Sequence, residues 1–232
     1  FDTSRYLEDI AKQIKNKAAH ADIVCFPAFI GISNFKKHHE ALQELTGKLI
    51  YEIPALPPSL PGMRIDNALK SRFASLGGVF IAGDRVISGV IKNGMLENVR
   101  TANNMNEVLK SHCYVLASGS FFSGGMTSDS ASIREPVFNL RVEYSPNRGD
   151  WASDKLFDKN SHKFIEYGVE TNDSMNPFGA DGSSISNMFC AGAILPHYNP
   201  VKDACGSGVA ISTGYCAAKN IVNRIKGSKD RK

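Results

Sequence analysis

The chain has 232 residues, of which 42% are hydrophobic and 22% are charged, and its formal net charge is +4. Its longest apolar run, residues 23–32, is far shorter than the roughly 20 residues of a membrane helix, and no N-terminal signal pattern is present. The mild, dispersed charge lacks the basic stripe with interleaved aromatics of a nucleic-acid-binding surface. A chain of this length can bury a sizeable core, as one large domain or two small ones.

The first and last residues of the sequence each support an expectation. The first residue is Phe1 rather than Met, from which we expect a processed or truncated chain. The last residues, 226–232, are basic, which favours a solvated C-terminus, with electrostatic contact to an acidic membrane surface as the alternative.

Cysteine usage excludes two classes of protein. The five cysteines are odd in number and none has C-x-x-C spacing, so we expect neither a disulfide framework nor an iron–sulfur or zinc site of the chain's own. The reducing cytoplasm is therefore the expected compartment.

The first quarter of the chain alternates helix and strand patterns. Apolar periodicity predicts a helix over residues 4–19, a buried strand over 23–26, a helix capped by Ser33 that ends at Gly47, and a strand over 49–53. This β–α–β order indicates an α/β layer.

A proline-rich segment, residues 54–62, is predicted to be irregular and to cross between two lobes. A helix follows, with apolar residues from Ile65 to Leu76 at spacings of four, four and three, and Gly77 stops it. Next we expect a β meander with an Asn93-Gly94 hairpin turn. Its strands are predicted over residues 79–81, 85–92 and 95–101.

The second half has two ordered regions separated by a polar one. A buried strand from Tyr114 runs into a loop of small residues that ends at Gly125, and residues 126–185 show weak periodicity. A strand over 188–194, a loop and a helix from Gly206 to about Lys226 close the chain.

Two features of this half suit a bound anion or cofactor. A helix that begins Gly206-Ser-Gly208 presents free N–H groups and the positive end of its dipole, suited to a phosphate or the pyrimidine end of a flavin; a tightly packed core helix is the structural alternative. The strand end Leu116–Gly119 is a common ligand position, although it also fits an ordinary strand–loop junction. No G-x-G-x-x-G follows a strand, so the usual dinucleotide fingerprint is absent.

Four stretches carry a family resemblance: residues 54–64, 116–125 with 133–136, 167–173, and 191–209. Through them the chain resembles the B subunits of the anaerobic glycerol-3-phosphate dehydrogenases, within the succinate dehydrogenase and fumarate reductase type of flavoprotein. The resemblance implies an α/β fold of the FAD/NAD(P)-binding type that is incomplete, its glycine-rich βαβ unit lying upstream of Phe1. It also implies two interleaved lobes. The cap or substrate lobe would comprise residues 1–62 and 121–185, the flavin-binding lobe would comprise residues 63–120 and 186–227, and residues 228–232 would form a tail.

The resemblance also implies which residues contact the flavin. They are Ala117, Ser118, Gly119, Gly192, Asn199, Gly206, Ser207, Gly208 and Val209. The sequence departs from the family at residues 196–199, where glycines and an aspartate are usual, yet Asn199 can still hydrogen-bond a ribityl hydroxyl.

Three side chains are candidates for catalysis. Arg134 and Arg64 match phosphate or carboxylate geometry, with ordinary ion pairs as the alternative. His197 is a candidate base, although a lone histidine is more often a packing or solvent-facing residue. No metal ligands are expected.

The function implied is flavin-dependent oxidation of sn-glycerol 3-phosphate to dihydroxyacetone phosphate, with electrons passed toward quinone. We expect FMN in this subunit, with FAD as the alternative, beside a sister FAD subunit and an iron–sulfur subunit, peripherally on the cytoplasmic face of the inner membrane. This portion alone is expected to be inactive. The alternatives are a non-catalytic scaffold with a degenerate flavoprotein fold, or a flavoprotein acting on another small acid.

Overall fold

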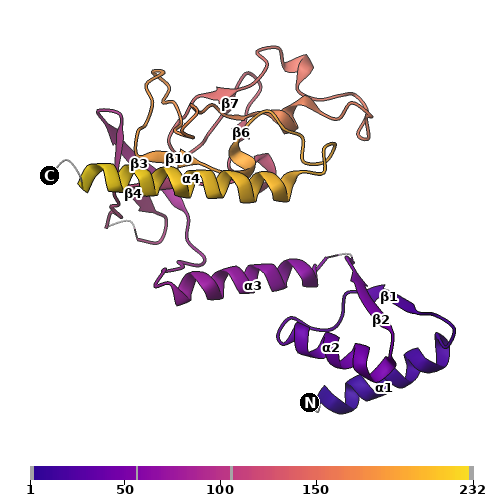
Figure 1. The fold of residues 1–232 in the computed structure, drawn as a ribbon. Coiled ribbons are helices and arrows are strands. Elements are labelled where there is room, and N and C mark those ends of the chain that lie inside the picture. Colours follow the sequence, from indigo (N-terminus) through magenta and orange to yellow (C-terminus); the bar gives the residue numbers. More distant parts are fainter. Residues whose placement is uncertain (1–2, 56, 105–106, 230–232) are drawn as a thin grey trace. The chain divides into compact units, whose positions relative to one another are not determined.

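The computed structural model describes residues 3–55, 57–104 and 107–229. The chain divides into two compact units, Phe1–Ala82 and Gly83–Lys232, and both contain helices and strands (Figure 1). Residues 121–185 belong to the same compact unit as 83–120 and 186–232. The assignment of residues to a cap lobe and a flavin-binding lobe stays a prediction.

The first unit is a small α/β layer. Its elements are α1 (Thr3–Lys17), β1 (Ile23–Pro27), α2 (Phe35–Thr46), β2 (Leu49–Ile53) and α3 (Leu60–Ser75). Strands β1 and β2 pair in parallel, with Ile23 opposite Leu49, as their connection through a helix requires. The predicted helix–strand–helix–strand order is confirmed.

Helices α1 and α2 bury a core against this sheet. The core consists of Ala11, Ile30, Leu42 and Ile50. Helix α2 ends where glycine adopts a φ of 67° at Gly47, whose N–H donates to the Gln43 carbonyl. Its N-cap is Asn34, not Ser33 as the sequence predicted, and the Asn34 side chain makes no capping hydrogen bond.

Helix α3 begins earlier than the prolines predicted. The segment 54–62 was expected to be irregular throughout, but α3 starts at Leu60 and takes Pro61 into its first turn. Proline fits there because the first helical N–H groups have no intrahelical acceptor. Ser59 caps the helix by accepting the Gly62 N–H at 3.2 Å.

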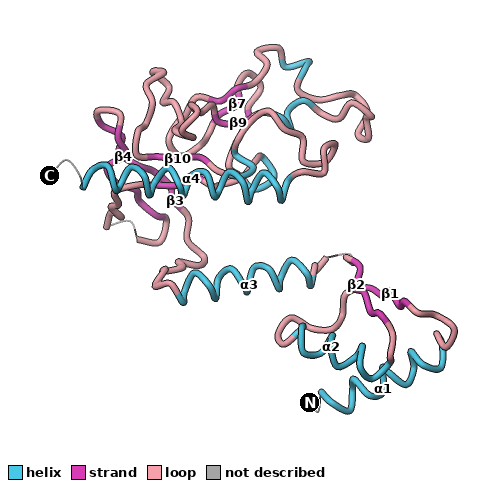
Figure 2. Tube along the Cα trace, in the orientation of Figure 1, coloured by secondary structure: helices cyan, strands magenta, loops and turns pink. Residues whose placement is uncertain are grey.

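The second unit combines short strands with long irregular segments (Figure 2). Its strands are β3 (Val86–Lys92), β4 (Met95–Thr101), β5 (Tyr114–Leu116), β6 (Thr127–Ser128), β7 (Ile133–Arg134), β8 (Val142–Glu143), β9 (Gly168–Val169) and β10 (Met188–Cys190). Its helices are the 3-10 turns η1 (Phe121–Ser123), η2 (Arg148–Asp150), η3 (Lys163–Glu166) and η4 (Gly192–Ile194), and α4 (Gly206–Lys229).

The predicted β meander is a two-stranded hairpin. Strands β3 and β4 pair antiparallel around the Asn93-Gly94 turn, as expected, but residues 79–81 are not a strand. That segment lies between Gly78 and a turn at Gly83 and has no ladder partner in the described part of the chain. The third partner of the hairpin comes after it instead, as a bridge between Val99 and Leu109.

The last predicted strand is also shorter than expected. Strand β10 ends at Cys190, and residues 192–194 turn into η4. Strands β5 and β10 form a parallel pair, with Met188 opposite Tyr114. The predicted closing helix is confirmed as α4 and extends to Lys229.

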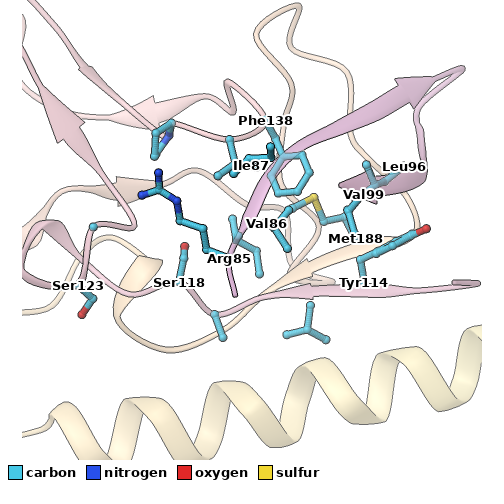
Figure 3. A pocket seen from close by; sticks show the side chains of 16 residues that line it. Arg85, Val86, Ile87, Leu96, Val99, Tyr114, Ser118, Ser123, Phe138 and Met188 are labelled. Carbon is cyan, nitrogen blue, oxygen red and sulfur yellow. The ribbon is translucent and has the colours of Figure 1, made fainter. Parts of the chain in front are cut away.

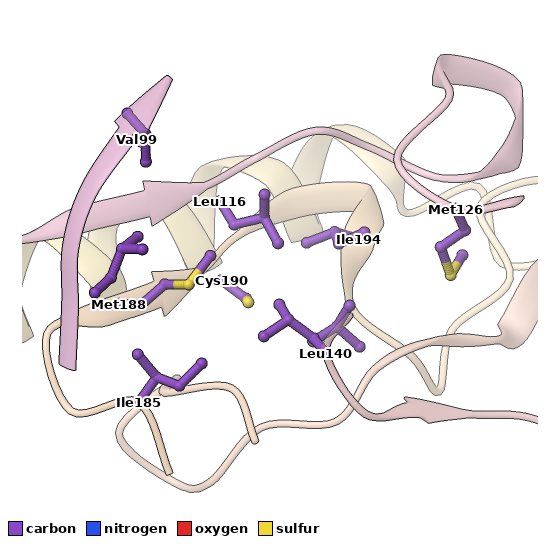
Figure 4. Close-up of a cluster of buried hydrophobic side chains, with 10 residues drawn as sticks. Val99, Leu116, Met126, Leu140, Ile185, Met188, Cys190 and Ile194 are labelled. Carbon is purple, nitrogen blue, oxygen red and sulfur yellow. The ribbon is translucent and has the colours of Figure 1, made fainter. Parts of the chain in front are cut away.

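The main core of the second unit lies between the hairpin, the parallel pair and the irregular segment (Figure 4). It contains Leu96, Val99, Leu116, Met126, Leu140, Val169, Ile185, Met188, Cys190 and Ile194. Asn187, which is 1% exposed, joins the hairpin to the parallel pair: its side chain accepts the Leu96 N–H and donates to the Leu96 carbonyl. This double hydrogen bond holds the hairpin over the two strand ends.

Candidate functional site

The carboxyl ends of β5 and β10 lie next to each other and are tied to α4. The Ala191 N–H donates to the Leu116 carbonyl at 3.0 Å, which continues the parallel ladder by one bond. The Gly192 N–H then donates to the Thr213 hydroxyl oxygen at 2.8 Å, and the Thr213 hydroxyl donates to the Val209 carbonyl. One side chain of α4 therefore fixes the position at which β10 ends.

A cavity of about 790 Å³ lies at the end of β5, between that strand, the hairpin and the loops around residues 123 and 137. Its volume is in the range of pockets that hold small molecules and cofactors. The wall is mostly apolar, and Arg85, Ser118 and Ser123 are among its few polar side chains (Figure 3). Ala117 and Ser118, two of the predicted cofactor contacts, line it.

The loop after β5 folds back tightly on itself. Gly119 has a φ of 82°, which favours glycine. A Cβ on Gly125 would come within 1.9 Å of the Gly119 carbonyl oxygen, so any larger residue there would displace the loop. The Gly125 N–H donates to the Ser120 carbonyl, which closes the turn beside the pocket.

The remaining predicted cofactor contacts do not line this pocket. They are Gly119, Gly192, Asn199, Gly206, Ser207, Gly208 and Val209. In the first turn of α4, the Val209 N–H is bonded to the Cys205 carbonyl, and a Cβ on Gly208 would meet open space. That helix end is accessible, but Figure 3 shows α4 running past the pocket on the opposite side of β5.

Asn199 has a structural role that the sequence did not predict. It is 1% exposed. Its side-chain oxygen accepts the N–H groups of Val201 and Lys202, and its amide nitrogen donates to Ser161 and Glu166. The amide has used its two donors and both acceptor positions within the chain, so the expected bond to a ribityl hydroxyl has no group left to form it.

Arg64 forms an ion pair in the first unit. Its guanidinium bonds the Glu52 carboxylate and the Gly31 carbonyl and stacks 3.8 Å from the centre of the Phe35 ring. Burial opposes ionisation of Glu52, but the Arg64 hydrogen bond and two backbone N–H groups together lower its pKa. The pair joins α3 to the end of β2, which is the structural alternative considered for this arginine.

Arg134 and His197 are also paired. Arg134 meets Asp129 at 3.2 Å on an exposed surface, the ordinary ion pair that the sequence left open. His197 Nε2 lies 3.0 Å from Glu143 on a solvent-facing loop, with a φ of 69°. None of the three catalytic candidates lines the pocket.

The comparisons with known proteins decide the family. The sequence profile of the family described as "FAD binding domain" matches residues 2–209. The chain belongs to this family.

Three relatives are named as the B subunit of anaerobic glycerol-3-phosphate dehydrogenase. The one from Vibrio cholerae serotype O1 is 36% identical over 213 residues, 92% of this chain and 49% of the relative. That from Vibrio vulnificus is 36% identical over 95% of this chain and 49% of the relative, and that from Yersinia enterocolitica is 32% identical over 97% and 52%. The chain spans about half the length of these curated relatives. No solved structure matches it.

The pocket has features that fit a flavin. Apolar and aromatic side chains form most of its wall, as the flat ring system of a flavin requires. The Ser118 hydroxyl oxygen is buried and has no hydrogen-bond partner among the described residues, so it is available to a ligand. Arg85, Phe138 and Met188 also line the pocket; no motif marked them, because only the fold brings the hairpin over the end of β5. No helix in the described part of the chain is long and apolar enough to cross a membrane.

Proposed function

We propose that this chain is part of a flavin-dependent dehydrogenase subunit of the anaerobic glycerol-3-phosphate type and contributes to its flavin site. The observation that supports it most is the FAD-binding profile over residues 2–209, together with relatives that carry the dehydrogenase name. A bound flavin would supply the redox chemistry by taking up and releasing electrons. The chain's own residues bind and orient it: the strand end at Ala117 and Ser118 and the apolar wall of the pocket.

The finer proposal concerns substrate and cofactor. The whole protein would oxidise sn-glycerol 3-phosphate to dihydroxyacetone phosphate and pass the electrons toward quinone, with FMN as the flavin and FAD as the alternative. Because this sequence has no G-x-G-x-x-G after a strand and covers 49% of the Vibrio cholerae relative, a glycine-rich βαβ unit outside these residues would complete the flavin site.

The proposed partners follow from the relatives' names, which describe one subunit of a larger enzyme. We propose a sister FAD subunit and an iron–sulfur subunit, peripheral on the cytoplasmic face of the inner membrane. The iron–sulfur cluster would reside on the partner.

The test is the flavin content and activity of the protein purified with its natural partners. We expect one flavin in this subunit in addition to the FAD of the sister subunit, assigned to this chain and identified as FMN or FAD by mass, and reduction of both by sn-glycerol 3-phosphate. Purified complex in which this subunit carries no flavin would contradict the proposal. If succinate or another small acid reduces the flavin and glycerol 3-phosphate does not, the chain is still part of a flavoprotein, but the proposed substrate is wrong.

A second candidate is a non-catalytic scaffold with a degenerate flavoprotein fold. It is favoured by the loop 196–199, where the side chain expected to contact the ribityl chain is bonded entirely within the protein. A complex that assembles and stays active although this chain carries no flavin would support the scaffold.

A further inference from the structure

The pocket at the end of β5 has a polar end and an apolar end. In Figure 3 the side chains of Arg85, Ser118 and Ser123 lie at one end, and Phe138, Met188, Leu96 and Val99 lie at the other. A ligand that fills such a cavity has an apolar or aromatic body and one hydrophilic group. Its apolar part contacts the apolar wall, and its hydrophilic group forms the polar contacts that water would otherwise make at the other end.

The polar end is positively charged. Arg85 is exposed at the mouth of the pocket, and its guanidinium makes no ion pair or hydrogen bond with any described residue. Among the residues that the structure describes, no aspartate or glutamate lines the cavity. The neighbouring Asp84 accepts the backbone N–H groups of Arg85 and Asn103, so it is held in the turn before β3.

Ser118 adds an unused hydrogen-bonding group at the same end. Its hydroxyl oxygen is buried and has no partner among the described residues, and a buried polar group left unpaired is costly. A hydroxyl can donate one hydrogen bond, and a guanidinium offers several donors in a plane. Together they suit an oxyanion with several oxygens, such as a phosphate.

We propose that this pocket binds an aromatic mononucleotide, with the phosphate at Arg85 and Ser118 and the ring between the hairpin and the Phe138 loop. The inference rests on the proposed function and deepens it by assigning an anion-binding role to Arg85. Two parts of a flavin cofactor share this chemistry: the flavin mononucleotide itself and the adenylate half of FAD.

The test separates the phosphate from the ring. NMR titrations of the ¹⁵N-labelled 232-residue chain, which detect weak binding, would compare FMN with riboflavin and AMP with adenosine. In each pair the two ligands differ only in the phosphate. We expect amide shifts at residues 85–87 and 117–118, and a roughly tenfold to hundredfold lower Kd for the phosphorylated ligand of the pair that binds. A gain with FMN or with AMP identifies which part the pocket holds.

Variants assign the phosphate contact. Arg85→Gln and Ser118→Ala should each remove most of the phosphate-dependent gain and leave the Kd of the unphosphorylated ligand within about twofold. Lys92→Gln is the matched control. It removes one positive charge from the other end of β3, where Lys92 pairs with Glu97 on the surface, and it should keep the full gain. Unchanged amide spectra would establish that each variant folds.

Two outcomes overturn the inference. A phosphate gain that persists in Arg85→Gln, or ligand shifts confined to residues outside the pocket, places the anion elsewhere; flavin content of the natural complex then still supports the proposed function. Absence of any phosphate-dependent binding also overturns it. Conversely, an Arg85-dependent gain with AMP beside a natural complex that lacks flavin would contradict the proposed function and leave the pocket assigned.

Discussion

Glu135 is a carboxylic acid that the fold buries almost completely, with 1% of its surface exposed. It follows Arg134, which remains on the surface. Its carboxylate accepts the N–H groups of Val137 and Phe138 and so shapes the loop that forms one wall of the pocket. Burial raises the pKa of the Glu135 carboxyl, against the opposing effect of these backbone hydrogen bonds.

We predict that Glu135 makes stability fall as pH rises. Because the folded pKa lies above the unfolded value, the folded state holds the proton more tightly, and this contribution is fully present below the unfolded pKa and lost as pH rises through the folded one. In urea unfolding measured from acid to neutral pH, Glu135→Gln should remove this part of the decline. Glu97→Gln, at an exposed position, should leave it unchanged; identical curves for parent and Glu135→Gln would contradict the prediction.

Asn199 provides the second prediction at this scale. Asn199→Ala should lower the free energy of unfolding by about 1–3 kcal/mol, because it removes a side chain that is 1% exposed, together with its hydrogen bonds to Ser161 and to the Val201 and Lys202 N–H groups. Chemical denaturation of the parent, Asn199→Ala and the exposed-site control Asn223→Ala measures this. A change no larger than that of the control would show that the Asn199 hydrogen bonds do not stabilise the fold, and Asn199 would again be a candidate contact for the flavin.

At the scale of elements, a hydroxyl of the closing helix is hydrogen-bonded to the backbone just after β10. Strand β10 has three residues and β5 has three, so their ladder alone gives few hydrogen bonds. Thr213 accepts the Gly192 N–H just after β10. The adjacent Ser212 bonds only carbonyls of its own helix. Substitutions of Thr213 and Ser212 therefore distinguish the loss of a hydrogen bond to the strand end from the loss of a hydrogen bond within the helix.

We predict that Thr213→Val costs about 1–3 kcal/mol of unfolding free energy, since valine keeps the shape and leaves the Gly192 N–H unpaired. Ser212→Ala, the control, should change it by less than about 0.5 kcal/mol. Hydrogen exchange at the Gly192 amide, which should become faster only in Thr213→Val, locates the loss. Equal effects of the two substitutions would show that the tie does not stabilise the strand ends.

At the scale of the whole molecule, each compact unit has a core of its own. Leu42 is fully buried in the first unit and Leu140 is buried in the second. Leucine-to-alanine substitutions in cores cost about 2–5 kcal/mol through lost contacts and the cavity left behind. The two leucines therefore form a matched pair that tests whether the units behave as separate cooperative bodies.

We predict that Leu42→Ala speeds hydrogen exchange in residues 3–55 and 57–82 while exchange in 83–104 and 107–229 is unchanged, and that Leu140→Ala does the reverse. Peptide-resolved mass spectrometry of exchange in the two variants and the parent measures this. If either substitution speeds exchange throughout the chain, the units unfold together and the division by contacts is not a division of stability.

The sequence by itself determined the regular elements whose signals are local. The helix patterns of α1 and α2, the Asn93-Gly94 hairpin and the glycine-led start of α4 depend on periodicity, turn residues and caps that lie within a few positions of one another. The family could also be predicted, because its motifs are contiguous, and the profile match over residues 2–209 confirms it. The strand at 79–81 was wrong because a strand exists only with a partner, which the sequence does not specify.

Only the tertiary structure decided which residues share a site. Asn187 and Leu96 are 91 positions apart, and their hydrogen bonds hold the hairpin over the end of β5, which brings Arg85 beside Ser118 in one pocket. Chain folding also brings Ser161 and Glu166 to the Asn199 amide nitrogen, and it brings Glu52 to Arg64. The sequence specifies which groups a side chain carries. Whether those groups are free to bind a ligand depends on the neighbours that chain folding brings within hydrogen-bonding distance.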